Sequence, residues 1–301
     1  MKTTNYKIGT VGTLEISLPI IELGSGQPRG TIISLQHGGE LSSILINKLL
    51  VEREKSIIGT IRLLPVANPF GLIQDSRVDP IDNKNINRQF PGRADGDFTA
   101  RLSAALFELC QASDFVLDLH NFSQRQSPLL AGYAQISKEK KDAEINKLIS
   151  LLKPDAVWQV DTKRQQDQRY NGALDEVLAT NNIPSIFIEM PNINLINQSM
   201  IDRVADGIQN IFNNFQNPFI GKGNIPEFNA NYLYADQAGL FESTIKPLTN
   251  IVIGETLGTV HNLKNFKKTE IKSHLSGTVL SVLGRGVIRT GSKLASIGTR
   301  I

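Results

Sequence analysis

A histidine and a glutamate separated by two glycines form the first candidate for chemistry in this chain. The stretch "ISLQHGGELSS" (33–43) places His37 and Glu40 where an apolar run ends and a helical pattern begins. Glycines let the backbone turn sharply, so both side chains can point into one crevice. Taken alone, this pair is equally compatible with a capping glutamate beside a surface histidine.

A second histidine ends another apolar run, "FVLDLH" (115–120). Two imidazoles and one carboxylate suit Zn²⁺, and three protein ligands leave a fourth position for water, as in catalytic zinc sites. Together His37, Glu40 and His120 therefore predict one catalytic zinc ion per chain. Asp118 shares a strand face with His120, because side chains alternate with a period of two, and is placed to accept a proton from that imidazole. The alternative for Asp118 is an ordinary polar residue at a strand end.

Glu189 and a long loop supply further candidates. Glu189 follows the apolar residues 186–188, and burial raises a glutamate pKa toward neutrality, which suits a general base that later acts as an acid. A salt-bridged core glutamate is the alternative. The loop 68–93 is long enough to be functional and carries Arg77, Asn87 and Arg88 as donors. A guanidinium beside a metal can bind a carboxylate or stabilise an oxyanion, although most arginines are simply solvated.

The elements that must position these residues alternate along the chain. β-Branched apolar runs predict strands, and amphipathic segments between them predict helices. This order predicts an α/β fold with a mainly parallel mixed sheet, helices on both faces, and a ligand site beyond the carboxyl ends of the strands. The predicted strands are 31–36, 56–66, 115–120, 156–160 and 185–190, and the predicted helices are 40–54, 97–111, 144–152 and 200–215.

The C-terminal quarter has a different pattern. A Pro- and Gly-containing linker (217–228) is followed by two similar segments, 235–260 and 273–298, without helical periodicity. We therefore predict a catalytic domain over 1–216 and a small all-β domain over 217–301 that resembles the barrel-sandwich fold of lipoyl and biotinyl carriers. A carrier needs an exposed lysine at a hairpin tip, where this chain has "VLGRGV". We interpret the segment as a structural lid or rim.

Composition excludes several classes of protein. The net charge of +3 comes from 32 basic and 29 acidic residues that are interspersed, which argues against a nucleic-acid surface. Cys110 is the single cysteine, so neither an intrachain disulfide nor a Cys-based zinc site can form. The N-terminus lacks a signal-peptide pattern, and no apolar stretch reaches the ~18 residues of a membrane span. We expect a cytoplasmic protein, and the sequence is compatible with a homo-oligomer.

Five motifs in order, "QHGGE", "NPFG", "DNKNINRQFPG", "DLHN" and "IFIEMP", resemble the zinc carboxypeptidase superfamily. Within it the chain is most similar to the branch of succinylglutamate desuccinylases and aspartoacylases. The resemblance implies zinc on His37, Glu40 and His120 and a catalytic role for Glu189. It also implies substrate contacts by Arg77 at the scissile carbonyl, by Asn87 and Arg88 at a substrate carboxylate, and by the hydroxyl of Tyr170. Aspartoacylases use one further arginine, and the candidates for its position here are Lys163, Arg164 and Arg169.

The activity that this resemblance implies is zinc-assisted hydrolysis of an amide bond in a small N-acyl amino acid. Phe122, which follows "DLHN", is an aromatic side chain that would narrow the pocket beside the metal. Two alternatives remain open at this point. One is a carboxypeptidase that removes the C-terminal residue of a peptide, and the other is a non-catalytic zinc- or ligand-binding protein.

Overall fold

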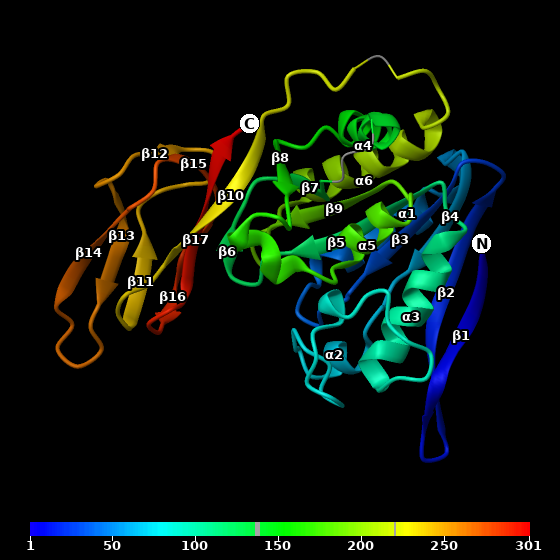
Figure 1. Ribbon diagram of the computed structural model, residues 1–301, viewed down its shortest axis with the longest axis horizontal. Coiled ribbons are helices and arrows are strands. Elements are labelled where there is room, and N and C mark those ends of the chain that lie inside the picture. Colours follow the sequence, from blue (N-terminus) through cyan, green and yellow to red (C-terminus); the bar gives the residue numbers. More distant parts are fainter. Residues whose placement is uncertain (136–138, 220) are drawn as a thin grey trace.

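The computed structural model describes residues 1–135, 139–219 and 221–301 (Figure 1). Within these residues, thirteen strands form one sheet that runs through the molecule, and four strands form a second sheet at one end. In spatial order the large sheet consists of β1 (Lys2–Val11), β2 (Leu14–Ser25), β4 (Gly59–Leu64), β3 (Arg29–Ser34), β5 (Phe115–Asn121), β9 (Ser185–Met190), β7 (Leu130–Ala134), β8 (Ala156–Val160), β10 (Glu227–Tyr234), β17 (Lys293–Arg300), β15 (Gly277–Leu283) and β12 (Asn250–Ile251), with β6 (Arg125–Gln126) paired to β15. The small sheet consists of β14 (Lys268–Lys272), β13 (Thr256–His261), β11 (Gly239–Ser243) and β16 (Arg285–Ile288).

Helices cover both faces of the N-terminal part of the large sheet. Neighbouring residues of one strand point to opposite faces, so Ile32 packs in the core under α1 and α6 while Ile33 packs in the core under α3. The first face is covered by α1 (Ser42–Glu52), α4 (Glu139–Leu152) and α6 (Gln198–Asn214), and the second by α3 (Phe98–Gln111) and α5 (Leu174–Thr180). Short helical turns lie in the connections: α2 (Pro69–Ile73), η1 (Glu54–Ser56), η2 (Ile86–Arg88) and η3 (Gln165–Tyr170). In the described ranges no helix is long and apolar enough to cross a membrane.

The five predicted strands and four predicted helices are present, with β8 and β9 at the predicted bounds. Helix α1 begins at Ser42, so Glu40 lies in the turn before the helix and not in its first turn. The sheet is mixed, as predicted, but the prediction that it is mainly parallel was wrong. Strands β3, β4, β5 and β9 pair in parallel, whereas β2 pairs antiparallel with β4 and β7 pairs antiparallel with β9.

Two local features explain this difference. The first 25 residues form the β1–β2 hairpin, which was not predicted. The alternating apolar residues of "ISLPI" (16–20) in β2 are typical of a strand with one buried face. Residues 122–129 alone separate β5 from β7. A parallel return requires a crossover of roughly a dozen residues or more, so β7 must run in the opposite direction to β5.

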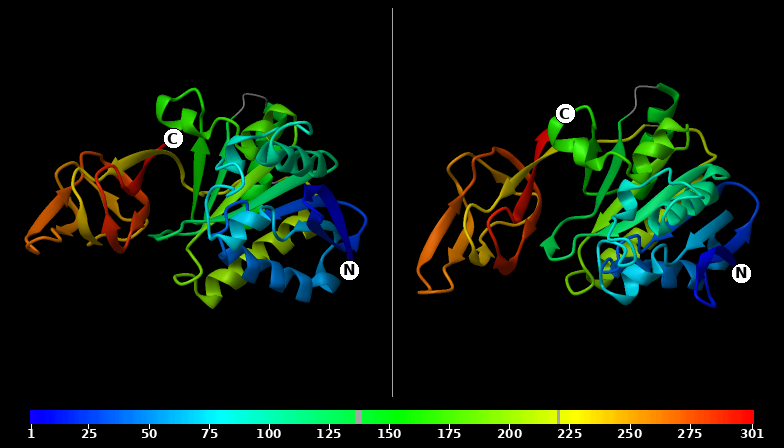
Figure 2. Two further views of the ribbon diagram at one scale, coloured as in Figure 1. Left: turned by 90° about the horizontal axis from the view of Figure 1, so that it is seen from below. Right: turned by 60° about the horizontal axis from the view of Figure 1, so that its bottom comes forward.

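The C-terminal strands continue the same sheet. Strand β10 pairs in parallel with β8, and β17 lies beside β10 (Figure 2). Side chains from both regions share one core cluster that includes Trp158, Phe187, Phe228 and Leu280. The division into domains at residue 216, two residues after α6 ends, stays a prediction.

The two similar C-terminal segments have matching backbones. Gly239 and Gly277 have φ angles of 157° and 153°, and a Cβ at either position would lie within 2.5 Å of a backbone carbonyl oxygen on a neighbouring strand. Gly254 and Gly291 both adopt left-handed φ angles of 87° and 82°. The second of the two segments, 273–298, extends into β17, which begins at Lys293.

The N-terminal hairpin should contribute to stability, because Leu18 on β2 is fully buried in the core under α3. We expect Leu18→Ala to lower the free energy of unfolding by about 2–5 kcal/mol, as for other buried leucines. Leu14→Ala on the same strand, where the side chain is 71% exposed, is the matched control and should change little. Urea unfolding followed by circular dichroism measures both, and equal stability of the two variants would contradict the packing of β2.

Candidate active site

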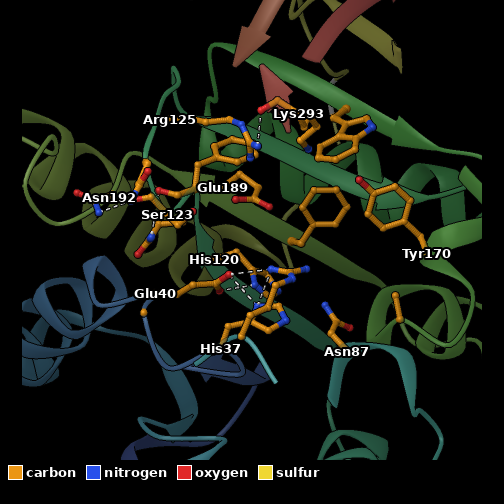
Figure 3. A pocket seen from close by; sticks show the side chains of 18 of the residues that line it. His37, Glu40, Asn87, His120, Ser123, Arg125, Tyr170, Glu189, Asn192 and Lys293 are labelled. Carbon is orange, nitrogen blue, oxygen red and sulfur yellow. Dashed lines mark hydrogen bonds and ion pairs between the residues drawn. The ribbon is translucent and has the colours of Figure 1, made fainter. Parts of the chain in front are cut away.

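Three buried side chains meet beyond the carboxyl ends of β3 and β5. His37, Glu40 and His120 each offer a ligand atom, and these atoms lie within 4.8 Å of one another (Figure 3). Glu40 Oε1 is 2.7 Å from His37 Nδ1, and Glu40 Oε2 is 2.6 Å from His120 Nδ1. Two nitrogens and a carboxylate that converge in this way form a donor set that fits Zn²⁺.

Two further side chains orient the imidazoles. His37 Nε2 lies 3.0 Å from Asn85 Oδ1, and His120 Nε2 lies 2.8 Å from Asp118 Oδ2. With a metal ion bound, each Nε2–H would donate to its oxygen and each Nδ1 lone pair would be free to bind the ion. Asp118 Oδ2 also accepts a hydrogen bond from Gln36 Nε2 at 2.7 Å. The predicted contact between Asp118 and His120 is thus present.

The turn that joins His37 to Glu40 is shaped by a neighbouring loop. The Glu40 N–H donates to the His37 carbonyl at 3.1 Å, and the Gly38 N–H donates to Ser76 at 2.8 Å. A Cβ on Gly38 would lie 1.8 Å from the Gly71 carbonyl oxygen. Close approach of the backbone at 71–76 therefore requires a glycine here, in addition to any need for a sharp turn.

Burial and charge act in opposite directions within the cluster. Burial would raise the pKa of Glu40, but the adjacent His37 and His120 imidazoles hold it well below its ordinary range. Burial would lower the pKa of His120, but Asp118 and Glu40 raise it well above its ordinary value. The cluster therefore keeps a carboxylate ionised in a buried place, as a metal ligand requires.

Glu189 faces the same cavity from the adjacent strand. It pairs in register with His120 across β5 and β9, and Figure 3 shows its carboxylate above the His–Glu–His cluster. Burial is the largest influence on its carboxyl group and raises the pKa to about 7. Within the described part of the chain, its Oε2 has no hydrogen-bond partner, which leaves an acceptor directed at whatever enters the cavity.

The cavity has a volume of about 740 Å³ and contains most of the predicted substrate-binding residues. Asn87 Oδ1 accepts a hydrogen bond from the Leu174 N–H at 2.8 Å, so its amide NH₂ is the group left for a ligand. Arg77 Nη1 lies 3.8 Å from Glu40 Oε1, and the Arg88 guanidinium lies 4.9 Å from the centre of the Tyr170 ring. The predicted residues in the cavity lining are Arg77, Asn87, Arg88, Arg169 and Tyr170.

Arg164 does not belong to this set. Its guanidinium donates to Asp167 Oδ2 at 3.1 Å and to Asn229 Oδ1 at 2.6 Å, outside the cavity lining. Lys163 is exposed and also absent from the lining. Of the three candidates left open by the sequence, Arg169 is the one that lines the cavity, and a substrate contact by Arg164 stays a prediction that this position does not favour.

Several residues in the cavity lining or in contact with the His–Glu–His cluster were not predicted from the sequence. Arg125 and Asn85 lie within or next to motifs that were already noted, so proximity to those motifs was an available signal. Asp175, whose pKa is raised to about 6 by burial and then by repulsion from Asp118, is the second residue of α5 and carries no local signal. Lys293 comes from β17, and only the tertiary structure brings it here.

The succinylglutamate desuccinylase/aspartoacylase catalytic domain matches residues 28–214, which is more than half of the chain. The chain belongs to this family. An N-α-acetyl-L-2,4-diaminobutyric acid deacetylase of Halomonas elongata is 30% identical over 113 residues. That alignment covers 36% of this chain, and the chain spans about a third (33%) of the length of that relative.

Solved structures of the family share the fold of the whole chain. A succinylglutamate desuccinylase/aspartoacylase from Rhodobacter sphaeroides has a TM-score of 0.83 at 19% identity and covers 99% of this chain and 94% of its own. An aspartoacylase family protein from Mesorhizobium loti has a TM-score of 0.80 at 20% identity, with 100% and 95% covered. A metallo-carboxypeptidase from Burkholderia cenocepacia is more distant, with a TM-score of 0.55 at 15% identity over 69% and 63% of the two chains. The wider carboxypeptidase-like fold is therefore also shared.

The contact between Asp118 and His120 should matter for metal affinity. We expect Asp118→Asn to weaken the binding of zinc by about tenfold to a hundredfold, because a less basic acceptor holds the Nε2 proton less firmly. Competition with a chromophoric chelator measures the affinity. Asp236→Asn, at an exposed position, is the control, and equal affinities of the two variants would contradict a role for Asp118.

Proposed function

We propose that this protein is a zinc-dependent hydrolase that cleaves the amide bond of small N-acyl amino acids, with one zinc ion per chain on His37, Glu40 and His120. One observation carries the proposal: Glu189 Oε2, which is buried and has no hydrogen-bond partner among the described residues, belongs to a side chain that lines the same cavity as the His–Glu–His cluster. Membership of a desuccinylase and aspartoacylase family and the similarity to a deacetylase support amide hydrolysis.

The residues of this chain divide the work of such a reaction. When bound, zinc lowers the pKa of a coordinated water to about 7 and polarises a carbonyl group. Glu189 accepts the proton of the attacking water and returns it to the leaving amine, and a pKa near 7 suits both steps. Arg77 donates to the oxyanion that develops at the scissile carbonyl.

The remaining cavity residues bind and orient the substrate. Asn87 and Arg88 hold the α-carboxylate of the amino acid, with the guanidinium of Arg88 steadied against the Tyr170 ring. Burial lowers the pKa of Arg88, and a bound carboxylate would offset this unfavourable burial of charge.

We also propose that residues 1–216 form a catalytic domain and that residues 217–301 form a second domain, which covers part of the cavity.

This partial cover favours a small substrate over a peptide. Lys293 of the C-terminal region lines the cavity together with Glu189 and Arg77, so this region contributes to the cavity wall. A screen of zinc-loaded protein against N-acetyl amino acids, N-succinyl amino acids and dipeptides tests the proposal. Hydrolysis of the acylated amino acids supports it, whereas hydrolysis of dipeptides alone would indicate a carboxypeptidase.

Glu189→Gln should reduce kcat by about a hundredfold to ten-thousandfold, because it removes the base and the acid while keeping the shape of the side chain. Zinc content should stay at one ion per chain, since the metal ligands are unchanged. Turnover is measured by release of the free amino acid, with the exposed Glu52→Gln as control. A Glu189→Gln protein with the kcat of the wild type would remove Glu189 from the reaction, and absence of turnover in both would indicate a non-catalytic zinc- or ligand-binding protein.

Arg77→Ala should lower kcat by about a hundredfold or more, since the loss of one oxyanion donor typically costs roughly 3 kcal/mol. KM should change much less, because the oxyanion develops after the substrate binds. Steady-state kinetics on the best substrate of the screen give both constants, with Arg289→Ala at an exposed position as control. Near-normal kcat in Arg77→Ala would remove this residue from the reaction.

A further inference from the structure

Gln36 is a buried side chain beside the metal cluster that has no part in the proposed reaction. It directly precedes His37, is fully buried and does not belong to the cavity lining. Its amide Nε2 donates to Asp118 Oδ2 at 2.7 Å, and His120 Nε2 lies 2.8 Å from the same oxygen. Gln36 therefore contacts the acid that orients a proposed metal ligand from the side away from the cavity.

The shared oxygen makes the orientation of Asp118 depend on Gln36. Asp118 Oδ1 is buried without a hydrogen-bond partner in the described ranges, so both hydrogen bonds of the carboxylate involve Oδ2. The bond from Cβ to an aspartate carboxylate has only a weak rotational preference, and contact with His120 alone would leave it free to turn. The N–H donor of Gln36 fixes which oxygen faces the imidazole.

The Gln36 amide is poorly satisfied within the fold, which argues against a purely structural role. Its contact with Asp118 is the single hydrogen bond of this side chain among the residues that the structure describes, and its Oε1 is buried with no partner. Burial of an unpaired carbonyl oxygen is unfavourable, and an apolar side chain of similar size would avoid that cost. Local departures of this kind are expected at functional sites.

The backbone before Gln36 shows a second departure. Strand β3 ends at Ser34, and the fully buried Leu35 has a left-handed φ of 57°, which is unfavourable for a leucine and persists only where surrounding contacts hold it. Those contacts come from Asn68. Its N–H donates to the Leu35 carbonyl at 3.0 Å, and its Nδ2 donates to the Gln36 carbonyl at 3.4 Å.

This end of the strand lets two consecutive side chains act on one imidazole. In a regular strand, neighbouring side chains point to opposite faces of the sheet. Here Gln36 reaches His120 through Asp118, and His37 reaches the same ring through Glu40, whose Oε2 lies 2.6 Å from His120 Nδ1. Each nitrogen of the ring is therefore linked to one acid, and each acid to one residue of the pair 36–37.

We propose that Gln36 is a positioning residue for the metal site, which acts on the ion through Asp118 and His120. The inference rests on the proposed function, because it assumes one zinc ion on His37, Glu40 and His120. Gln36 holds Asp118 Oδ2 against the Nε2–H of His120, and this contact keeps the opposite nitrogen of the ring, Nδ1, directed at the ion. Gln36 itself binds neither the ion nor the substrate.

Zinc affinity, measured by competition with a chromophoric chelator, tests this role without any need for turnover. Gln36→Met has a similar length but lacks the donor, and we expect it to weaken zinc binding by about threefold to tenfold, less than Asp118→Asn does. Gln36→Asn keeps the amide but is one methylene too short to reach Asp118, so it should weaken binding to a similar extent. The exposed Gln111→Met is the matched control and should bind zinc as the wild type does.

A double-mutant cycle separates positioning through Asp118 from a general effect on packing. In an Asp118→Ala background, Gln36→Met should change the zinc affinity by less than about twofold, whereas independent effects would multiply. The visible spectrum of the cobalt(II)-loaded protein gives a second readout, because its bands report the geometry of the ligands. These bands should shift in Gln36→Met and stay unchanged in Gln111→Met.

The outcomes distinguish this inference from the proposed function. Wild-type zinc affinity in both Gln36→Met and Gln36→Asn would overturn the role of Gln36, and so would an equal loss with and without the Asp118 carboxylate. Circular dichroism of the zinc-free proteins checks that each variant is folded, and Gln36→Asn carries the comparison if Gln36→Met is not. A wild type that binds no zinc would contradict both proposals, whereas a wild type that binds zinc without hydrolysing any substrate would contradict the proposed function alone.

Discussion

The site depends on one buried carboxylate that lies between two imidazoles. Glu40 is removed from water, and an isolated charge there would be strongly unfavourable. Its two oxygens contact the Nδ1 atoms of His37 and His120 at 2.7 Å and 2.6 Å, and these contacts hold it ionised. The arrangement exists because β3 and β5 are parallel neighbours, so that both strands end at the same edge of the sheet.

The surroundings of the cluster follow from this constraint. Each imidazole must present Nδ1 to Glu40, and Asn85 and Asp118 contact the opposite nitrogen of each ring. The backbone at 71–76 packs against Gly38, which ties the long loop 68–93 to the turn between the two ligands. That loop then carries Asn87 to the cavity wall, where its amide oxygen is anchored by the first residue of α5. The proposed metal ligands and the proposed substrate contacts are therefore parts of one packed unit.

The C-terminal strands are joined to this unit through the sheet and through aromatic packing. Pairing of β8 with β10 extends the sheet, and Tyr232 on β10 lies between cations of the catalytic and the C-terminal regions. From the sequence, residues 217–301 were predicted to be a structural lid or rim. The structure adds that this region supplies a charged side chain, Lys293, to the cavity.

The sequence by itself indicated the three side chains of the His–Glu–His cluster and the strands beside which or on which they lie. Strands 156–160 and 185–190 were predicted to the residue, because buried strands leave a local apolar pattern. Family membership, predicted from five short motifs, is confirmed. The direction of β7 and the N-terminal hairpin were not predicted. The short connection between β5 and β7 and the apolar alternation in β2 were the features that could have indicated them.

Only the tertiary structure decided which cations share the cavity with Glu189. Arg164 and Arg169 are five residues apart in one polar stretch, yet one pairs with Asp167 outside the cavity and the other lies over Tyr232 inside it. Arg125 and Lys293 meet because β6 and β17 both lie against β15, and such pairing joins segments that are distant along the chain. Residue type and local periodicity carry no record of that pairing, because it is set by the packing of whole strands against one another.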